Sequence, residues 1–251
     1  MKTIKNILPI SFFFTLLILW EFVPFLFSIP NYVFPRLSDI FHAIIKSKSA
    51  FLANSITTFH EAILGFILGS SVGFITGVLM AQSKLFAKTI LPYVVASNAI
   101  PIVAIAPLVI IWFGHDIASK VILAAFLCFF PLAINTFKGL NEYSAIYKEL
   151  FYTYGANNFE FLIKFKIRNA VPFIFSGLKL NATYSVIGAI VAEFIGATSG
   201  LGFGMLQASY NLNTPRLFGY IFIACSMGLG MYYLMVLIEK LTLKNKKHEQ
   251  D

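Results

Sequence analysis

The chain has 251 residues, of which 58% are hydrophobic and 12% are charged, and its formal net charge is +8. Soluble domains carry about 25% charged residues, so this composition indicates an integral membrane protein with roughly five to seven crossings of about 20 residues each. We expect no catalytic or nucleotide-binding domain in such a chain, and any energy source is expected in a partner. The basic residues lie at the ends of apolar segments rather than on one aromatic-rich face, which excludes a nucleic-acid-binding surface.

The first crossing is predicted at 7–27, after a short basic start with Lys2 and Lys5. Its apolar run is longer than the roughly 7–15 residues of a signal-peptide core, so we expect a retained helix with its amino end inside. Glu21 is expected to face water or a neighbouring helix, because an ionised side chain is unfavourable in lipid. Residues 35–48 have apolar side chains on one face and predict a helix lying on the outer membrane surface.

The second crossing, predicted at 57–81, carries glycines at a strict four-residue spacing. In a bilayer this spacing makes a smooth stripe along which another helix can approach closely. We therefore expect the stripe to be a helix-packing surface. Its members are Gly65, Gly69, Gly73 and Gly77.

The third crossing, predicted at 89–113, contains three prolines that should break or kink any helix through it. Backbone groups freed at membrane depth are tolerated only where protein or a water-filled cavity covers them, so this segment is predicted to line a pathway. We add to this predicted pathway one polar residue of the fourth crossing, predicted at 117–137, and one of the fifth. The predicted pathway residues are Ser97, Asn98, Pro101, Pro107, Asn135 and Glu193.

Residues 145–168, called the elbow below, are too polar and too basic to cross a bilayer. We predict a short helix, a break at Gly155 and Ala156, and a second, amphipathic helix. The residues that fall at helical spacing in this second helix are Phe159, Leu162, Ile163 and Lys166. A half-apolar elbow is expected to present itself to another protein; the alternative is an amphipathic loop lying on the membrane surface.

The fifth crossing is predicted at 171–195 and the sixth at 217–241. Glu193 is either a functional group or a residue bonded to backbone N–H groups of the glycine-rich stretch that follows, and it has no obvious basic partner. That stretch, 199–204, lacks the ending of a phosphate-binding loop and is predicted to form a tight outer turn. With this topology fourteen of the nineteen Lys and Arg residues are cytoplasmic, which places both termini inside.

The cysteines and histidines give no sign of a metal or disulfide. Cys128 and Cys225 lie inside apolar runs, where each is expected to act as a small buried hydrophobic residue. His42 and His60 lack further ligands at metal-binding spacing. We expect no metal and no cofactor to be bound by this chain.

The elbow resembles the coupling segment of ABC-importer permeases, which docks into a groove on a cytoplasmic ATPase. The positions that match the family pattern are Glu149, Gly155, Phe165 and Ile167. The positions that depart from it are Leu150 and Phe151, where the pattern has alanines, and Arg168, where it has proline. The ATPase contacts that the resemblance implies are Glu149, Gly155, Ala156 and Phe159.

A second resemblance covers nearly the whole chain. The string from Ile100 to Lys120, with its prolines and its Trp-Phe-Gly, is similar to the permeases of nitrate, sulfonate, taurine and thiamine-pyrimidine-precursor importers. It implies a permease of the bacterial inner membrane that pairs with a second copy of itself, with a cytoplasmic ATP-binding-cassette ATPase that binds ATP and Mg²⁺, and with an external solute-binding protein. The implied solute is a small anion or a thiamine-pyrimidine precursor.

The predicted fold is therefore an all-α integral membrane protein, one permease domain over 1–251 with about six transmembrane helices and a cytoplasmic coupling helix between the fourth and fifth. The chain is predicted to be a transport subunit rather than an enzyme. A self-sufficient secondary transporter or channel is the alternative, and it would need intramembrane charge pairs or proton-relay acids. An intramembrane enzyme would need a nucleophile–base or metal constellation.

Overall fold

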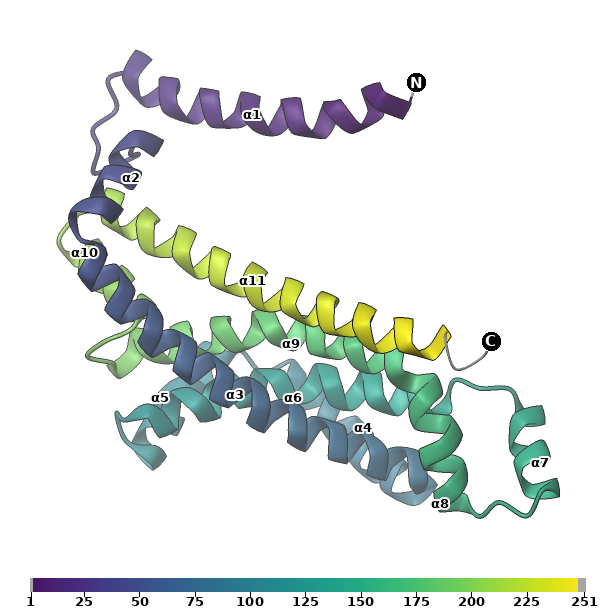
Figure 1. The fold of residues 1–251 in the computed structure, drawn as a ribbon. Helices are drawn as coiled ribbons and strands as arrows, with labels where there is room; N and C mark the ends of the chain where they lie inside the picture. Colours follow the sequence, from purple (N-terminus) through teal and green to yellow (C-terminus); the bar gives the residue numbers. More distant parts are fainter. Residues whose placement is uncertain (1, 248–251) are drawn as a thin grey trace. The chain divides into compact units, whose positions relative to one another are not determined.

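The computed structural model describes residues 2–247, with side chains described for 11–243, and all regular structure in that part of the chain is helical, as predicted (Figure 1). The helices are α1 (Lys2–Leu26), α2 (Leu37–Lys46), α3 (Lys48–Gln82), α4 (Lys84–Asn98), α5 (Ile102–Phe113), α6 (Ile117–Asn141), α7 (Ala145–Thr153), α8 (Asn158–Phe161), the π-helix η1 (Leu162–Lys166), α9 (Ile167–Gly196), α10 (Leu201–Tyr210) and α11 (Thr214–Lys247). The chain divides into two compact units, Met1–Thr57 with Thr198–Cys225, and Thr58–Ala197 with Ser226–Asp251.

In the first unit, the Glu21 carboxylate joins α1 to α2. It accepts hydrogen bonds from the Ser38 amide at 3.1 Å and from the Ser38 hydroxyl at 2.7 Å. Ser38 lies in the first turn of α2, where backbone N–H groups have no acceptor within the helix and a negative charge is favourable. Of the two predicted surroundings of Glu21, water or a neighbouring helix, the structure shows contact with the neighbouring helix α2.

The glycine-rich stretch of the first unit is helical, so the predicted tight turn is wrong for residues 201–204. The chain bends over residues 198–200, the Gly200 amide donates to Asn54 Oδ1 at 3.0 Å, and α10 begins at the next residue. The Tyr220 ring covers Gly204, where a Cβ would lie 2.5 Å from the ring. The Tyr220 hydroxyl accepts a hydrogen bond from the Asn54 side chain at 3.1 Å. These glycines serve close packing against an aromatic ring, which a sequence pattern does not distinguish from a turn.

In the second unit, α6 is held closely by glycines of two neighbours. All four glycines of the α3 stripe face α6. A Cβ at Gly73 would lie 2.5 Å from the Phe129 carbonyl oxygen, and one at Gly69 would overlap the backbone of Ala125. From α9, a Cβ at Gly188 would lie 2.6 Å from Ala124 Cα. The three backbones therefore approach one another at van der Waals distance, as small residues permit in membranes.

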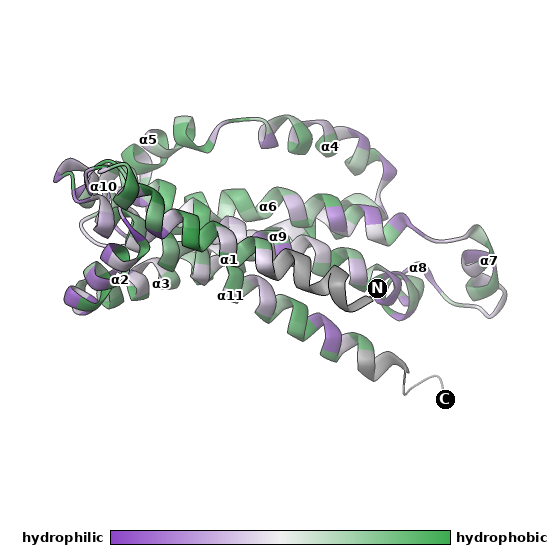
Figure 2. Ribbon diagram, turned by 90° about the horizontal axis from the view of Figure 1, so that it is seen from above, coloured by the Kyte–Doolittle hydropathy of each residue, from purple (hydrophilic) through white to green (hydrophobic). Residues whose placement is uncertain are grey.

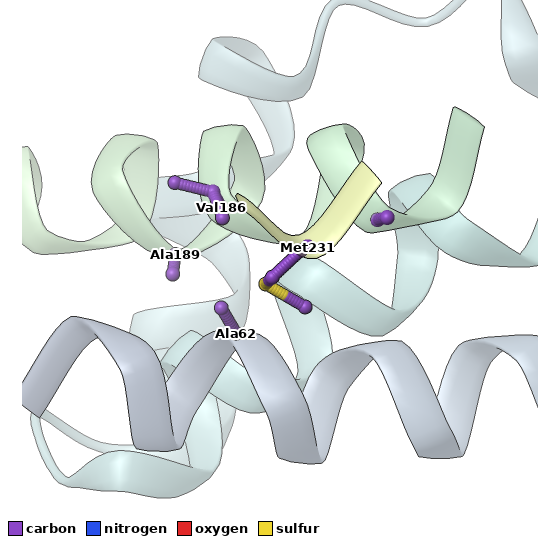
Figure 3. Close-up of a cluster of buried hydrophobic side chains, with 5 residues drawn as sticks. Ala62, Val186, Ala189 and Met231 are labelled. Atoms are coloured by element: carbon purple, nitrogen blue, oxygen red, sulfur yellow. The ribbon is translucent and has the colours of Figure 1, made fainter. Parts of the chain in front are cut away.

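A second contact region of this unit joins α3, α9 and α11 through small side chains. The Met231 side chain of α11 lies between α9 and Ala62 of α3 (Figure 3). The other members of this buried cluster are Ala182, Val186 and Ala189 of α9. Met fills such irregular gaps because its unbranched thioether has several rotatable bonds.

In the described part of the chain, four helices are long and apolar enough to cross a membrane, namely Lys48–Gln82, Ile117–Asn141, Asn158–Gly196 and Thr214–Leu243. The pair α4 and α5 makes a fifth if it is one span bent by 101°. The described apolar part of α1, Ser11–Leu26, is shorter, so the crossing predicted at 7–27 stays a prediction. Figure 2 shows α5 as hydrophobic, whereas α7 and α8 also carry hydrophilic residues.

Two breaks flank α4. Ser83 alone separates α3 from α4, and its hydroxyl caps α4 by accepting from the Phe86 amide at 3.2 Å. Pro92 is accommodated inside α4, and the chain breaks instead before Pro101, which stands at the N-cap of α5. A proline disfavours helical backbone in the residue before it, which explains why the break falls there.

The close approach of α3 and α6 makes Gly69 intolerant of even one methyl group. We expect Gly69→Ala to lower the free energy of unfolding by about 1–3 kcal/mol, the usual effect of overpacking. Gly230→Ala is the matched control, because a Cβ at Gly230 meets nothing within 4 Å. Thermal unfolding of the purified protein measures both, and equal stability of the two variants would contradict the close contact.

Candidate functional site

The elbow turns at a glycine that the local geometry requires. After α7, the Gly155 amide donates to the Tyr152 carbonyl and the Ala156 amide donates to the Phe151 carbonyl, both at 3.0 Å. This pair of bonds is the Schellman arrangement that ends a helix, and it needs a left-handed residue at the first position after the cap. Gly155 has φ +77°, in agreement. The predicted helix, break and second helix are present in the structure.

The second arm of the elbow begins with a capping box. The Glu160 amide donates to Asn157 Oδ1 at 2.8 Å, and the Asn157 amide donates to Glu160 Oε2 at 3.1 Å. The other Glu160 oxygen pairs with Lys164 Nζ at 2.9 Å. The reciprocal bonds satisfy two amides that would otherwise lack acceptors at the start of α8. The break is thus defined on both sides.

Aromatic side chains fill the space between the two arms. Phe161 and Phe165 stack with ring centroids 5.3 Å apart, and Tyr147 of α7 stacks on Phe165 at 4.9 Å. Phe151 packs on Phe161 at 5.3 Å. Aromatic pairs at these separations contribute about 0.5–1.5 kcal/mol each beyond area burial. The elbow therefore has a small core of its own and can move as one body.

The predicted face of the second arm is wrong in part. Phe159 and Ile163 are exposed, at 66% and 48%, whereas Leu162 and Lys166 are buried. The predicted register assumes 3.6 residues per turn, and the π-helix over Leu162–Lys166 departs from it. Nothing in the sequence marks this π-turn.

Of the four predicted ATPase-contact residues, Gly155 and Ala156 line a hollow of about 340 Å³ on the elbow. Glu149 and Phe159 are exposed outside this hollow, and their contact with an ATPase stays a prediction. The remaining residues lining the hollow are Leu150, Phe151, Tyr154, Glu160 and Lys164.

Helix α7 has an apolar surface that the described residues leave exposed. None of its residues is buried. Ile146 is 70% exposed, Leu150 is 48% exposed, and Tyr154, directly after the helix, is 83% exposed. These three residues were not predicted as contact residues from the sequence, although apolar side chains in a short polar segment indicate a contact surface. Such a surface indicates a partner.

A buried cluster of polar residues, which we call the carboxyl cluster, joins α3, α6 and α9. Its members are Thr58, Glu61, Lys120 and Glu193, each less than 5% exposed. The Thr58 hydroxyl donates to Glu193 Oε1 at 2.6 Å, and the Glu61 carboxyl lies beside the Glu193 carboxyl, with its buried Oε2 making no hydrogen bond to the described residues. The Lys120 ammonium attracts both carboxyl groups. From the sequence Glu193 has no obvious basic partner; the structure brings the Lys120 ammonium of α6 near enough to attract it.

The carboxyl cluster is tied to the corner between α5 and α6. The Lys120 ammonium donates to the His115 carbonyl, and His115 Nδ1 lies 3.2 Å from the Gly196 carbonyl at the end of α9. Two carboxyl groups and one ammonium group therefore share a buried site. The His115 contacts join this site to the corner between α5 and α6 and to the end of α9.

The other predicted pathway residues lie at the α4–α5 break and on α6. Ser97 is half-buried near the end of α4, and Asn98, Pro101 and Pro107 are exposed. Asn135 donates its side-chain amide to the Pro131 carbonyl of its own helix at 2.8 Å. The sequence also failed to single out Asn181, which donates to Ser70 Oγ at 2.9 Å and to the Cys128 carbonyl at 2.6 Å and so links α9 to α3 and α6.

Comparison with known proteins gives one consistent result. A family model described as the binding-protein-dependent transport system inner membrane component matches residues 69–244. A probable ABC transporter permease protein of Haemophilus influenzae is 30% identical over 92% of this chain and 94% of its own length. The formylaminopyrimidine transport permease protein ThiX of Halalkalibacterium halodurans is 30% identical over 96% of each chain. The riboflavin transport system permease protein RibX of Chloroflexus aurantiacus is 30% identical over 91% of this chain and 86% of its own.

The region matched by the family model contains the elbow and the α4–α5 break. It also contains Lys120 and Glu193 of the carboxyl cluster, whereas Thr58 and Glu61 precede it. The matches agree with the apolar helices and with the resemblances in the sequence. The chain belongs to the family of binding-protein-dependent transport system inner membrane components, and it is an ABC importer permease.

Proposed function

We propose that the chain forms the solute pathway of an ABC importer across the inner membrane and that its elbow is the coupling element for a separate cytoplasmic ATPase. In this proposal two copies pack about a twofold axis, an external binding protein delivers the solute, and both termini are cytoplasmic. ATP and Mg²⁺ are bound by the ATPase and not by this chain. Family membership supports the ATPase and the binding protein as partners.

The observation that carries the proposal is the exposed apolar surface of α7 on a rigid elbow. An ATPase that grips this surface moves the whole elbow, because the aromatic core joins α7 to the second arm. That arm continues without interruption through η1 into α9. A push on α7 therefore reaches the helix that carries Glu193 and packs on α6. ATP binding would favour one of two arrangements of these helices by making different contacts in each.

The α4–α5 pair is proposed to line the pathway. Its bend of 101° interrupts the helical backbone between α4 and α5. In a membrane an interrupted helix is tolerated only against protein or a water-filled cavity. Ser97, Asn98, Pro101 and Pro107 then contact the solute, with Asn135 and the carboxyl cluster behind them as support.

The solute is proposed to be a small anion, such as nitrate, a sulfonate or taurine, or a thiamine-pyrimidine precursor. Relatives named for formylaminopyrimidine transport and for aliphatic sulfonates transport support this range, and a third relative is named for riboflavin transport. The external binding protein makes the main selection, and its ligand is the direct measurement. Transport without an ATPase receives no support from the family relationship.

Site-specific cross-linking tests the ATPase contact. A photo-reactive amino acid at Tyr154, which is 83% exposed beside α7, is expected to cross-link to the ATPase, with a yield that changes on ATP binding. Tyr233 on α11 is the matched control, because it is 65% exposed but lies within an apolar helix long enough to cross the membrane. Cross-linking from Tyr233 and not from Tyr154 in an active complex would reject the proposed coupling role.

A further inference from the structure

A cavity of about 840 Å³ opens beside the elbow, within the second unit. Its walls come from the α3–α4 connection, from the end of α6 and from both arms of the elbow, which lie at the same end of this unit (Figure 1). The charged residues that line it are Lys84, Lys88, Lys138, Lys148, Lys166 and a single acid, Glu142. No carboxylate forms an ion pair with any of these lysines in the part of the chain whose side chains are described.

Lys166 is the most informative of the five lysines, because it is only 6% exposed. A buried ammonium group is unfavourable unless an anion or several acceptors surround it. Its nearest acceptor is the Ala81 carbonyl at 3.5 Å, and its ammonium lies 5.3 Å from the centroid of the Tyr143 ring. Lys148 adds a second positive charge that repels it. The cavity thus holds more positive charge than its own residues balance, which favours an anionic ligand.

The opposite lining of the same cavity is apolar. The apolar side chains that line it include Met80, Leu91, Val95, Ile134 and Phe137. A free inorganic anion would contact only the lysines and leave the apolar lining exposed to water. A molecule with a charged head group and a hydrocarbon chain contacts both the lysines and the apolar lining. Basic pockets between membrane helices at the cytoplasmic side are suited to anionic lipid head groups.

We propose that this cavity binds an anionic phospholipid, with its phosphate among the lysines and an acyl chain along the apolar lining. The proposal rests on the proposed function for the cytoplasmic placement of the elbow. Because the cavity is bounded by α4, α6 and both arms of the elbow, the bound lipid holds the elbow against the bundle. Coupling to the ATPase then depends on the anionic lipid content of the membrane.

The test uses the purified, delipidated full-length permease and measures its melting temperature and lipid retention by native mass spectrometry. Phosphatidylglycerol is expected to bind and to raise the melting temperature, whereas phosphatidylcholine with the same acyl chains and inorganic phosphate are not. Lys166→Met is expected to weaken phosphatidylglycerol binding about fivefold, the equivalent of about 1 kcal/mol per lysine near an anionic lipid. The double variant K88Q/K138Q, in which both lysines are exposed, is expected to weaken it further without affecting folding.

Lys164→Met is the control, because Lys164 is exposed on the same arm, pairs with Glu160 and does not line the cavity. An equal effect of phosphatidylcholine would show an apolar groove without head-group recognition and overturn the proposal. Stabilisation by inorganic phosphate alone would assign the lysines to a free anion and also overturn it. The proposal would also be overturned if phosphatidylglycerol, phosphatidylcholine and inorganic phosphate all failed to bind. None of these outcomes touches the ATPase contact, which the cross-link at Tyr154 measures separately.

Discussion

The variant Gly155→Pro is expected to insert into the membrane and fold, yet to lose ATP-driven uptake almost completely. Proline fixes φ near −65°, whereas Gly155 has φ +77°, and proline also removes the amide that bonds to the Tyr152 carbonyl. A mismatch of this kind destabilises the native conformation of the elbow by about 3 kcal/mol, which lowers its population about 100-fold. The aromatic core between the arms cannot form in the altered conformation, so ATPase movement no longer reaches α9.

Gly155→Asn separates the backbone requirement from a simple effect of adding a side chain. Asparagine adopts left-handed backbone more readily than other residues with a Cβ, and a Cβ at Gly155 meets nothing within 4 Å. This variant is expected to keep most of the uptake. The measurements are membrane insertion, ATP hydrolysis and solute uptake in proteoliposomes that contain the complete importer. Wild-type uptake by Gly155→Pro would show that the elbow is not the point of transmission.

The sequence predicts those features that depend on local spacing. Four-residue glycine spacing determines one face of a helix, so the α3 stripe is visible without a partner helix. Gly155 follows a short helical segment, and Asn157 with Glu160 has the spacing of a capping box, so the elbow is predictable too. The class of the protein follows from composition alone, because so few charges cannot cover a soluble fold of this length.

Features that depend on long-range pairing could not be predicted in the same way. Glu61, Lys120 and Glu193 lie on three different helices, and only the packing of α3 and α9 on α6 brings them together. The register of the second elbow arm also failed, because a π-turn adds a residue that no local pattern announces. The break between α4 and α5 was predicted as a kink among three prolines, but which of them breaks the helix depends on the surrounding packing.

Removing the positive charge of the carboxyl cluster is expected to have the largest effect on stability. Lys120→Met should lower the free energy of unfolding by about 3–5 kcal/mol, the usual result of removing one partner of a buried charge pair. The buried carboxyl groups of Glu61 and Glu193 would lose the positive charge that attracts them. The His115 carbonyl would lose its donor as well. Lys46→Met is the control, because Lys46 is exposed at the end of α2. Chemical unfolding of the purified protein measures both.

The double variant Lys120→Met, Glu193→Gln distinguishes charge balance from packing. Glutamine removes one carboxyl group yet keeps an oxygen that accepts from the Thr58 hydroxyl, and Glu61 is then free to remain protonated and neutral. If Lys120 acts through its charge, the double variant recovers most of the stability that the single variant loses. If Lys120 acts only through its aliphatic stem, methionine already replaces that stem, and the single variant is as stable as Lys46→Met. Losses that simply add would show that Lys120 and Glu193 act independently, which contradicts a charge-balanced cluster.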